Sequence, residues 1–199
     1  SVFIGALAIL IIGLVDDYYK TRGKEFPIYP RFLVQILAAI LVYNSGISFS
    51  GFTNPITGEF VQLHIALQFL LTVTWLFGVT TVINWSDGMD GLAGSISTIS
   101  SVTLFIVALV MNQSDSAIVC IILVGAILGF LNYNRHPAVV FMGDSGANFL
   151  GFILGIIALD GAFKQATIMS LFIPILALGV PIFDNIFVIF KRYTEGKPV

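Results

Sequence analysis

The sequence predicts an all-α fold, a bundle of membrane-spanning helices with a small extracytoplasmic hairpin, in a single domain over residues 1–199. Two features of the composition indicate this class. Of the 199 residues, 57% are hydrophobic and only 10% are charged, whereas about 25% are charged in an ordinary soluble domain. The mean hydropathy is +0.99. With so few charges, most of the surface must face lipid rather than water.

Seven apolar segments account for the predicted spans, since a bilayer core of about 30 Å needs roughly 20 helical residues. The sixth segment is short, so we expect a steep angle or a contribution from Phe163. Pro174 and Pro181 predict a kink or a break in the seventh. The connection 48–64 contains Asn54-Pro55 and Thr57-Gly58, which predict a small hairpin. The segments cover residues 1–15, 32–47, 65–83, 92–111, 117–133, 147–159 and 166–190.

The two ends of the sequence predict a fragment of a longer membrane protein. The chain begins inside an apolar segment, and its first residues show no basic region or cleavage site of a signal peptide. It ends in a polar stretch, residues 195–199. We therefore expect one integral-membrane domain that is truncated at both ends.

The distribution of Lys and Arg predicts which connections face the cytoplasm. Under strict alternation of the spans, Lys164 stands alone on one side, and the other eight of the nine basic residues lie on the opposite side. That second side is therefore predicted to be cytoplasmic. Its basic residues are Lys20, Arg22, Lys24, Arg31, Arg135, Lys191, Arg192 and Lys197.

Two function classes are disfavoured by charge and cysteine content. The net charge is −2, and there is no basic stripe, so nucleic-acid binding is not expected. The single cysteine, Cys120, lies in an apolar run, which leaves neither a disulfide framework nor a cysteine metal site.

Of the eleven acidic residues, five aspartates fall in or beside three connections on the predicted cytoplasmic side, which also holds Glu25 and Glu195. Asp16 and Asp17 follow the first segment, Asp87 and Asp90 lie between the third and fourth, and Asp144 precedes the sixth. The outer acids, by contrast, are scattered. Three separate connections that bring carboxylates to one membrane face indicate a site there.

Two of these connections also have structural interpretations. Asp16 and Asp17 could form a solvated helix end partnered by Lys20 and Arg22, although adjacent carboxylates at a negative helix end repel each other and favour a bound cation. Asp90 could cap the fourth segment. Residues 84–91 (NWSDGMDG), however, hold two acids, two glycines and no basic residue. A divalent metal would have to carry any phosphate bound there.

The third connection, residues 134–146, combines acid, amide and basic side chains. Asp144 is a hard oxygen ligand, and Asn134 offers an amide. Arg135 and His136 could hold anionic groups, as could the N-terminus of the sixth segment. Alternatively, Asp144 or Ser145 caps that segment, and His136 makes only loop hydrogen bonds.

These motifs resemble those of the polyprenyl-phosphate N-acetylhexosamine-1-phosphate transferases, glycosyltransferase family 4. This family includes the peptidoglycan translocase and the enzymes that begin teichoic acid and O-antigen synthesis. The hairpin and the last two motifs are most similar to the teichoic-acid-initiating branch, which uses UDP-GlcNAc. The resemblance covers nearly the whole chain and rests on residues 13–17 (GLVDD), 84–92 (NWSDGMDGL), Asn134 through Asp144 to Gly146, and 181–184 (PIFD).

The resemblance implies a Mg²⁺-dependent enzyme at the cytoplasmic face of the cell membrane, with Mn²⁺ as an alternative ion. Undecaprenyl phosphate would attack the β-phosphate of UDP-GlcNAc and release UMP. The implied partners are therefore a UDP-sugar, undecaprenyl phosphate and the lipid bilayer; a homodimer stays open. Phosphoryl transfer needs positioning and charge neutralisation more than covalent chemistry. An acidic site with a bound metal can supply both.

The resemblance also implies roles for individual residues. Asn84 and Asp144 match metal ligands, and Asp16 matches a base toward the lipid phosphate. The implied catalytic residues are Asp16, Asp17, Asp87 and Asp90, the last two lining the nucleotide pocket, and the implied substrate-binding residues are Arg31, Asn134, Arg135 and His136.

The sequence departs from the family pattern in two ways. Arg31 stands where the family usually has Lys. The charge is kept, but the compact ammonium group of Lys is replaced by a planar guanidinium with several N–H donors. The family's histidine-rich loop, about two leading helices and one trailing helix are not within the sequence. We therefore expect residues 1–199 alone not to turn over UDP-GlcNAc.

Three alternative functions stay open. A phospho-MurNAc-pentapeptide transferase would carry the same motifs. An ion-coupled transporter would place acids near the membrane midplane, where only Asp184 fits, and Asp184 could equally satisfy the first turn of a helix restarted at Pro181. A non-catalytic scaffold predicts that the acidic connections do not converge.

Overall fold

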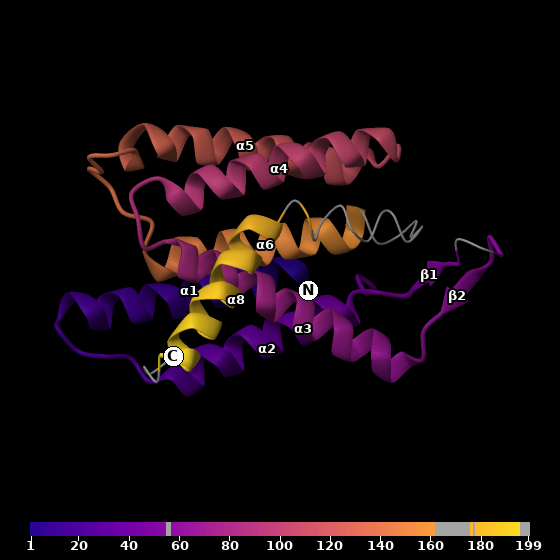
Figure 1. The fold of residues 1–199 in the computed structure, drawn as a ribbon, viewed down its shortest axis with the longest axis horizontal. Coiled ribbons are helices and arrows are strands. Elements are labelled where there is room, and N and C mark those ends of the chain that lie inside the picture. The colour runs from indigo at the N-terminus through magenta and orange to yellow at the C-terminus, as the bar shows by residue number, and fades with distance from the viewer. Residues whose placement is uncertain (55–56, 162–175, 177, 196–199) are drawn as a thin grey trace.

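The structure, a computed structural model, describes residues 1–54, 57–161, 176 and 178–195. The described part consists of seven helices and one hairpin, which confirms the predicted all-α bundle (Figure 1). The helices are α1 (Val2–Thr21), α2 (Ile28–Asn44), α3 (Ile65–Ser86), α4 (Leu92–Val110), α5 (Ser114–Asn134), α6 (Gly143–Gly161) and α8 (Gly179–Thr194).

Helix length and apolarity identify the chain as a membrane protein. Among the described helices, four are long and apolar enough to cross a membrane, namely α1, α3, α4 and α5. Helix α2 is apolar but has 17 residues. Helix α6 lies at the centre of the bundle, against α1, α3, α4 and α5, and is buried along most of its length. Because protein rather than lipid surrounds α6, it can carry glycines and polar residues that a lipid-facing span would avoid.

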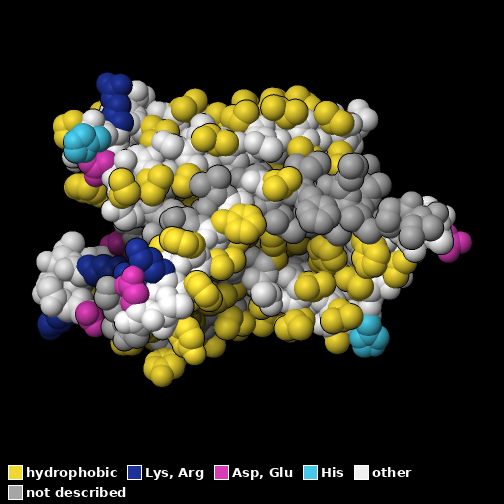
Figure 2. Space-filling model, viewed as in Figure 1, with side chains coloured by type: hydrophobic (Ala, Val, Ile, Leu, Met, Phe, Trp, Pro, Cys, Tyr) yellow, Lys and Arg dark blue, Asp and Glu magenta, His cyan; other side chains and the backbone are white. Residues whose placement is uncertain are grey.

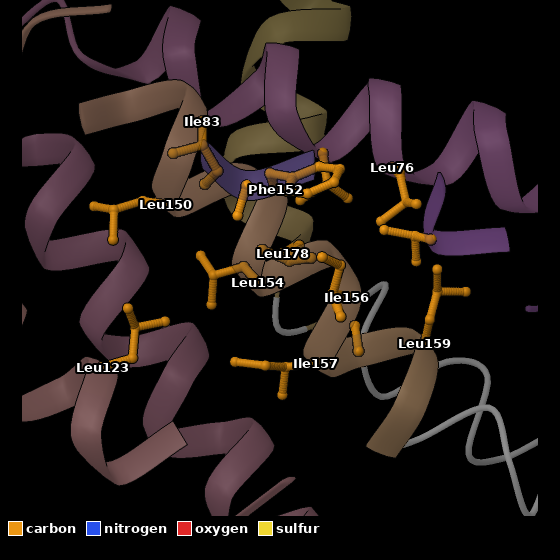
Figure 3. Close-up of a cluster of buried hydrophobic side chains, with 14 of the residues drawn as sticks. Leu76, Ile83, Leu123, Leu150, Phe152, Leu154, Ile156, Ile157, Leu159 and Leu178 are labelled. Atoms are coloured by element: carbon orange, nitrogen blue, oxygen red, sulfur yellow. The ribbon is translucent and has the colours of Figure 1, made fainter. Parts of the chain in front are cut away.

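The core is built around α6 (Figure 3). Phe152 and Leu154 of α6 are almost fully buried, as are Leu76 and Ile83 of α3, and Leu123 of α5 packs against the same cluster. Between apolar helices in lipid, close van der Waals packing rather than removal from water provides the attraction. This packing holds the N-terminus of α6 in a fixed place relative to α1 and α3.

The first and sixth predicted segments were too short. The first, predicted as residues 1–15, runs on to Thr21, so Asp16 and Asp17 lie inside α1 rather than beyond its end. The sixth, predicted as 147–159, begins at Gly143 and so includes Asp144. The predicted limits followed apolar residues, whereas these polar helix ends are held by partners on neighbouring helices.

The seventh predicted segment is described only in part. Phe163, residues 166–175 and residue 177, and with them Pro174, lie outside the described residues. The remainder forms α8, which begins at Gly179. Pro181 is thus the third residue of the helix rather than the first, a place where its missing N–H is still tolerated because first-turn donors have no helical acceptor.

The predicted hairpin is confirmed. Strands β1 (Gly51–Thr53) and β2 (Phe60–Gln62) pair antiparallel with Phe52 opposite Val61. The hairpin lies at the end of the bundle away from the α5–α6 connection (Figure 1). On the face shown in Figure 2, the Lys and Arg side chains gather at the end opposite the hairpin. On this face, the described Lys and Arg side chains follow the charge asymmetry predicted from the sequence.

Candidate active site

A cavity of about 280 Å³ opens where α1 and α3 end and α6 begins. It brings together the three acidic connections, as predicted. Asp16 does not line the cavity, but it shares its cationic partners with Asp144, which does. The lining residues are Asp17, Lys20, Asp87, Gly88, Met89, Asp90, Asn134, Phe141, Gly143 and Asp144.

Asp16 and Asp144 share two cations. Arg31 Nη1 of α2 lies 2.9 Å from Asp16 Oδ2 and 3.2 Å from Asp144 Oδ2. Lys20 contacts the same two carboxylates, with its Nζ 3.4 Å from Asp16 Oδ2. Two close carboxylates would otherwise repel each other, and Asp16 is only 2% exposed. The cluster therefore joins α1, α2 and α6 through charge at the edge of the cavity.

Asp17 caps the neighbouring helix α6. Its Oδ1 accepts the backbone N–H of Asp144 at 2.8 Å, and its Oδ2 accepts the N–H of Ser145 at 3.0 Å and the Ser145 hydroxyl at 2.7 Å. The sequence left open whether Asp144 or Ser145 caps α6. Instead, the capping residue is Asp17 of α1. The Asp144 carboxylate accepts a hydrogen bond from Asn84 Nδ2 at 3.0 Å.

Asp87 is a partly buried acid between two other carboxylates. Burial, and then the charges of Asp144 and Asp17, raise its pKa from 3.8 to about 6, although a hydrogen bond from the Gly143 N–H opposes this rise. The raised pKa means that ionised Asp87 adds to a concentration of negative charge. The cavity thus favours cations near Asp87 and Asp144.

Asp90 lies on the exposed rim. Its Oδ2 accepts the Ala138 N–H at 3.2 Å and lies 3.0 Å from His136 Nδ1. The Ala138 amide, and then His136, hold the pKa of Asp90 below its usual value. Asp90 does not cap α4 as the sequence allowed, because the N-cap there is Gly91, without a side-chain hydrogen bond. Asp90 instead ties the two connections together.

Asn134 also joins these connections. Its Oδ1 accepts the Gly91 N–H at 3.0 Å and its Nδ2 donates to the Val140 carbonyl at 2.9 Å. Arg135 and His136, predicted to bind substrate, do not line the cavity. They line an adjoining pocket of about 520 Å³ between α4 and α5, which shares Met89 and Asp90 with it.

The chain is similar in sequence to known proteins. The sequence model of "Glycosyl transferase family 4" matches residues 1–162. The chain belongs to this family. It is also similar to a probable undecaprenyl-phosphate N-acetylglucosaminyl 1-phosphate transferase of Bacillus subtilis, at 37% identity over 199 residues, which is all of this chain and 54% of the relative.

Other relatives carry a different name. A phospho-N-acetylmuramoyl-pentapeptide-transferase of Symbiobacterium thermophilum is 38% identical over 74% of this chain and 47% of its own length. The corresponding transferase of Enterococcus hirae is 34% identical over 75% of this chain and 47% of its own length. The chain therefore spans about half the length of the curated relatives it matches.

The donor set of this glycosyl transferase family 4 chain fits Mg²⁺ in chemistry, though not as a closed cage. Among the described residues, no three His, Cys, Asp or Glu side chains are grouped to enclose a metal. Asn84 and Asp144, predicted as ligands, are adjacent and carry oxygen donors. Mg²⁺ typically takes one or two protein carboxylates, with waters and substrate phosphates completing its shell. Two oxygen-bearing side chains beside a cavity suit that pattern.

Some site residues were missed by sequence reasoning. The sequence did not predict that Lys20 links Asp16 to Asp144, although its spacing of four from Asp16 places both on one helix face. Phe141 lines the cavity without having been assigned a role. The contact of Ser145 with Asp17 spans 128 residues, and no local pattern signals it. Asp184 lies in α8, but its side chain is outside the described part.

Proposed function

We propose that the protein transfers GlcNAc-1-phosphate from UDP-GlcNAc to undecaprenyl phosphate and releases UMP. The observation that carries the proposal is the acidic cavity at one end of a membrane helix bundle of glycosyl transferase family 4. Similarity to a relative named for this donor group and this lipid extends over the whole chain. A lipid phosphate presents itself at the membrane surface, where such a cavity can receive it.

In the proposed reaction, an oxygen of the lipid phosphate forms a bond to the β-phosphorus of the UDP-sugar. The bond from that phosphorus to the bridging oxygen breaks, and this oxygen leaves with UMP. Lys20 and Arg31 already hold anionic oxygens beside the cavity, so they can bind phosphate oxygens in the same way. Their role is to bring two anionic reactants together and to offset the charge that develops on UMP.

Asp16 is the proposed proton acceptor for the lipid phosphate. Because its Oδ2 is engaged by Arg31 and Lys20, the incoming phosphate must first draw one of these cations to itself. Asp16 then becomes accessible as the cation leaves it. Proton acceptance and phosphate binding are thereby coupled through the same pair of basic side chains.

Asn84 and Asp144 are the residues that would hold Mg²⁺. When bound, Mg²⁺ would neutralise diphosphate oxygens and polarise the phosphorus for attack. Asp87 and Asp90 are proposed to accept hydrogen bonds from the nucleotide, with Asn134 holding the two connections that carry them. Arg135 and His136, in the adjoining pocket, are placed to bind anionic or polar groups that extend beyond the nucleotide.

The cavity is proposed to face the cytoplasm. The bundle end that carries it also carries Lys20, Arg31 and Arg135, and basic residues concentrate on the cytoplasmic side of membrane proteins. UDP-sugars are soluble nucleotides, so a cavity on that side would meet them directly.

The test is a turnover assay on the intact protein in nanodiscs that contain undecaprenyl phosphate. UDP-GlcNAc, UDP-GalNAc, UDP-glucose and UDP-MurNAc-pentapeptide are supplied in turn, and UMP and the lipid product are measured. We expect UMP and undecaprenyl-diphosphate-GlcNAc with UDP-GlcNAc, abolished by EDTA and restored by Mg²⁺ or Mn²⁺. Turnover of only the pentapeptide donor would favour the peptidoglycan reaction. Release of UDP, or of no nucleotide, from well-folded protein would refute phosphosugar transfer.

A further inference from the structure

We infer that Asp17 is a positioning residue: it holds the first turn of α6 from the neighbouring helix α1 and thereby sets where Asp144 stands in the cavity. This is a different role from the catalytic one that its place in the motif predicts. The functional consequence rests on the proposed function, whereas the structural claim stands on contacts alone.

The hydrogen bonds of Asp17 are those of a helix cap. The first N–H groups of any helix lack a partner within the helix, and a side-chain oxygen normally supplied by the N-cap residue accepts them. In α6, both oxygens of Asp17 do this, at 2.8 Å to the Asp144 N–H and 3.0 Å to the Ser145 N–H. The Ser145 hydroxyl, at 2.7 Å, adds a third donor.

The backbones of α1 and α6 are shaped for this contact. A Cβ added at Gly13, one turn before Asp17, would lie 2.4 Å from Ser145 Cα. A Cβ added at Gly143 would lie 2.7 Å from Asp17 Oδ2, and Gly143 has φ +68°, which side chains other than Asn and Asp rarely adopt. Glycine at both places lets the carboxylate reach the helix end.

The neighbouring acid has a different environment. Asp16 is bound by the charged groups of Arg31 and Lys20, which a phosphate can draw away. The Asp17 partners described above are backbone amides and a hydroxyl, which substrate cannot carry off. These three donors occupy most of the acceptor positions of the Asp17 carboxylate, and a proton on that carboxylate would weaken its hold on the N-terminus of α6. The adjacent acids therefore divide two tasks between them.

The cap matters because Asp144 is the first residue that it holds. With its N–H fixed by Asp17, the Asp144 side chain reaches Asn84 Nδ2 at 3.0 Å and the two cations. One turn further on, Asn148 Nδ2 donates to the Asp144 carbonyl at 2.7 Å and Gln35 Nε2 donates to Asn148 Oδ1 at 3.0 Å. The backbone of Asp144 is thus tied at both its N–H and its C=O.

The test transfers the cap from one helix to the other. Asp17→Ala removes the cap. Gly143→Asn offers a replacement on α6 itself, since Asn tolerates positive φ and is a strong capping residue, but in the wild-type background its Cβ collides with Asp17. In the double variant, Asp17→Ala vacates the space that the Asn side chain needs. The single variants should each be impaired, and the double variant should recover.

Three measurements on the intact protein in nanodiscs show whether the double variant recovers. They are hydrogen exchange of the Asp144 and Ser145 amides, Mn²⁺ affinity by electron paramagnetic resonance, and kcat. Asp17→Ala should speed exchange, weaken Mn²⁺ binding by about tenfold or more and lower kcat by about 10²-fold. The double variant should regain at least tenfold in kcat, with slowed exchange and tighter Mn²⁺ binding.

A double variant that regains slow exchange and Mn²⁺ affinity but not kcat would overturn the inference, because Asp17 would then act on the substrate directly. A double variant no better than Asp17→Ala in all three readouts would overturn it as well. Asp17→Asn gives a check that keeps the side-chain shape and one acceptor oxygen. Its kcat should stay within about tenfold of wild type, since a cap tolerates Asn, and a loss beyond about 10³-fold would refute positioning. If the wild-type protein transfers no phosphosugar, exchange and Mn²⁺ binding still decide the structural claim.

Discussion

The cavity has two halves that are held in different ways. The half built by α1, α2 and α6 is cross-linked by side chains from all three helices: Arg31 joins Asp16 to Asp144, and Asp17 holds the start of α6. The half built by residues 87–91 and 135–142 consists of connections. There, His136 Nδ1 contacts Asp90, and the His136 side chain is 86% exposed.

The difference suggests that the helical half positions the reacting groups and that the connections determine substrate specificity. Phosphoryl transfer depends on reactants and charges being held within fractions of an ångström, which the helical half can provide. Connections adapt more easily and carry specificity in many proteins. We therefore expect changes in the helical half to act on kcat, and changes in the other half to act on KM.

The largest effect is expected from Asp144→Asn. Asn keeps the size of the side chain but removes the charge that attracts a divalent cation, so kcat of the intact protein should fall by roughly 10³-fold or more. The variant should still fold in the absence of metal, because the cap on α6 comes from Asp17. Retention of Mg²⁺-dependent turnover within a few fold would remove Asp144 from the metal site.

Arg31 should rank next. One atom, Nη1, makes both contacts, to Asp16 and to Asp144, so a single positive charge can bridge the two acids. Arg31→Gln leaves both acids to Lys20, and we expect kcat to fall by about 10²-fold. Arg31→Lys retains the charge and should lose only a few fold. Equal, severe losses in both variants would show that the forked geometry of the guanidinium is required.

The sequence predicted the helices of the half built by α1, α2 and α6, but not the contacts between them. Apolar segments located the helices, and alternation of the spans placed the acids of three connections at one end. The predicted C-terminus of α1 and N-terminus of α6 were wrong because Asp16, Asp17 and Asp144 are polar. Without knowledge of their partners, polar residues next to an apolar segment predict a loop. Asp17 and Asp144 are held by contacts between α1 and α6 that lie more than 120 residues apart in the chain, and Asp16 is held by Arg31 of α2.

The connection half was less predictable still. The sequence predicted Asn134, Arg135 and His136 as substrate-binding residues, but spacing cannot show that Asn134 is engaged by Gly91 and Val140. Nor can it show that Arg135 and His136 face a second pocket. Loop geometry depends on hydrogen bonds between two connections, and neither connection contains that information alone.

Asp90→Asn tests this half and should have a moderate effect. The exposed carboxylate holds the Ala138 N–H and His136, and Asn can replace only part of that pattern. We expect KM for the UDP-sugar to rise by about three- to tenfold, as for the loss of one or two hydrogen bonds, with kcat nearly unchanged. Asp115→Asn, at the opposite end of the bundle, is the matched control and should change neither constant. A fall in kcat as large as that of Arg31→Gln would erase the distinction between the halves.

The smallest effect is expected from Asp87, which lies on a connection but is affected by the charges of Asp17 and Asp144 in the helical half. Burial and the charges of Asp144 and Asp17 raise its pKa from 3.8 to about 6 in the folded protein. Because the folded state binds this proton more tightly than the unfolded chain, ionising Asp87 destabilises the fold. The destabilisation is absent below about pH 4 and complete above about pH 7, since it develops between the unfolded and folded pKa values.

Asp87→Asn should therefore stabilise the protein at high pH and not at low pH. In metal-free buffer, we expect its thermal unfolding midpoint to exceed that of wild type by about 2 °C at pH 8. The difference should shrink as the pH falls through 6 and vanish near pH 4, where both proteins are neutral at this position. Asp115→Asn again serves as the control, because Asp115 lies at the other end of the bundle. A stabilisation of equal size at pH 4 and pH 8 would mean that Asn improves packing or hydrogen bonding. In that case, Asp87 would not be coupled to the charges of α1 and α6, and the two halves of the cavity would be electrostatically separate.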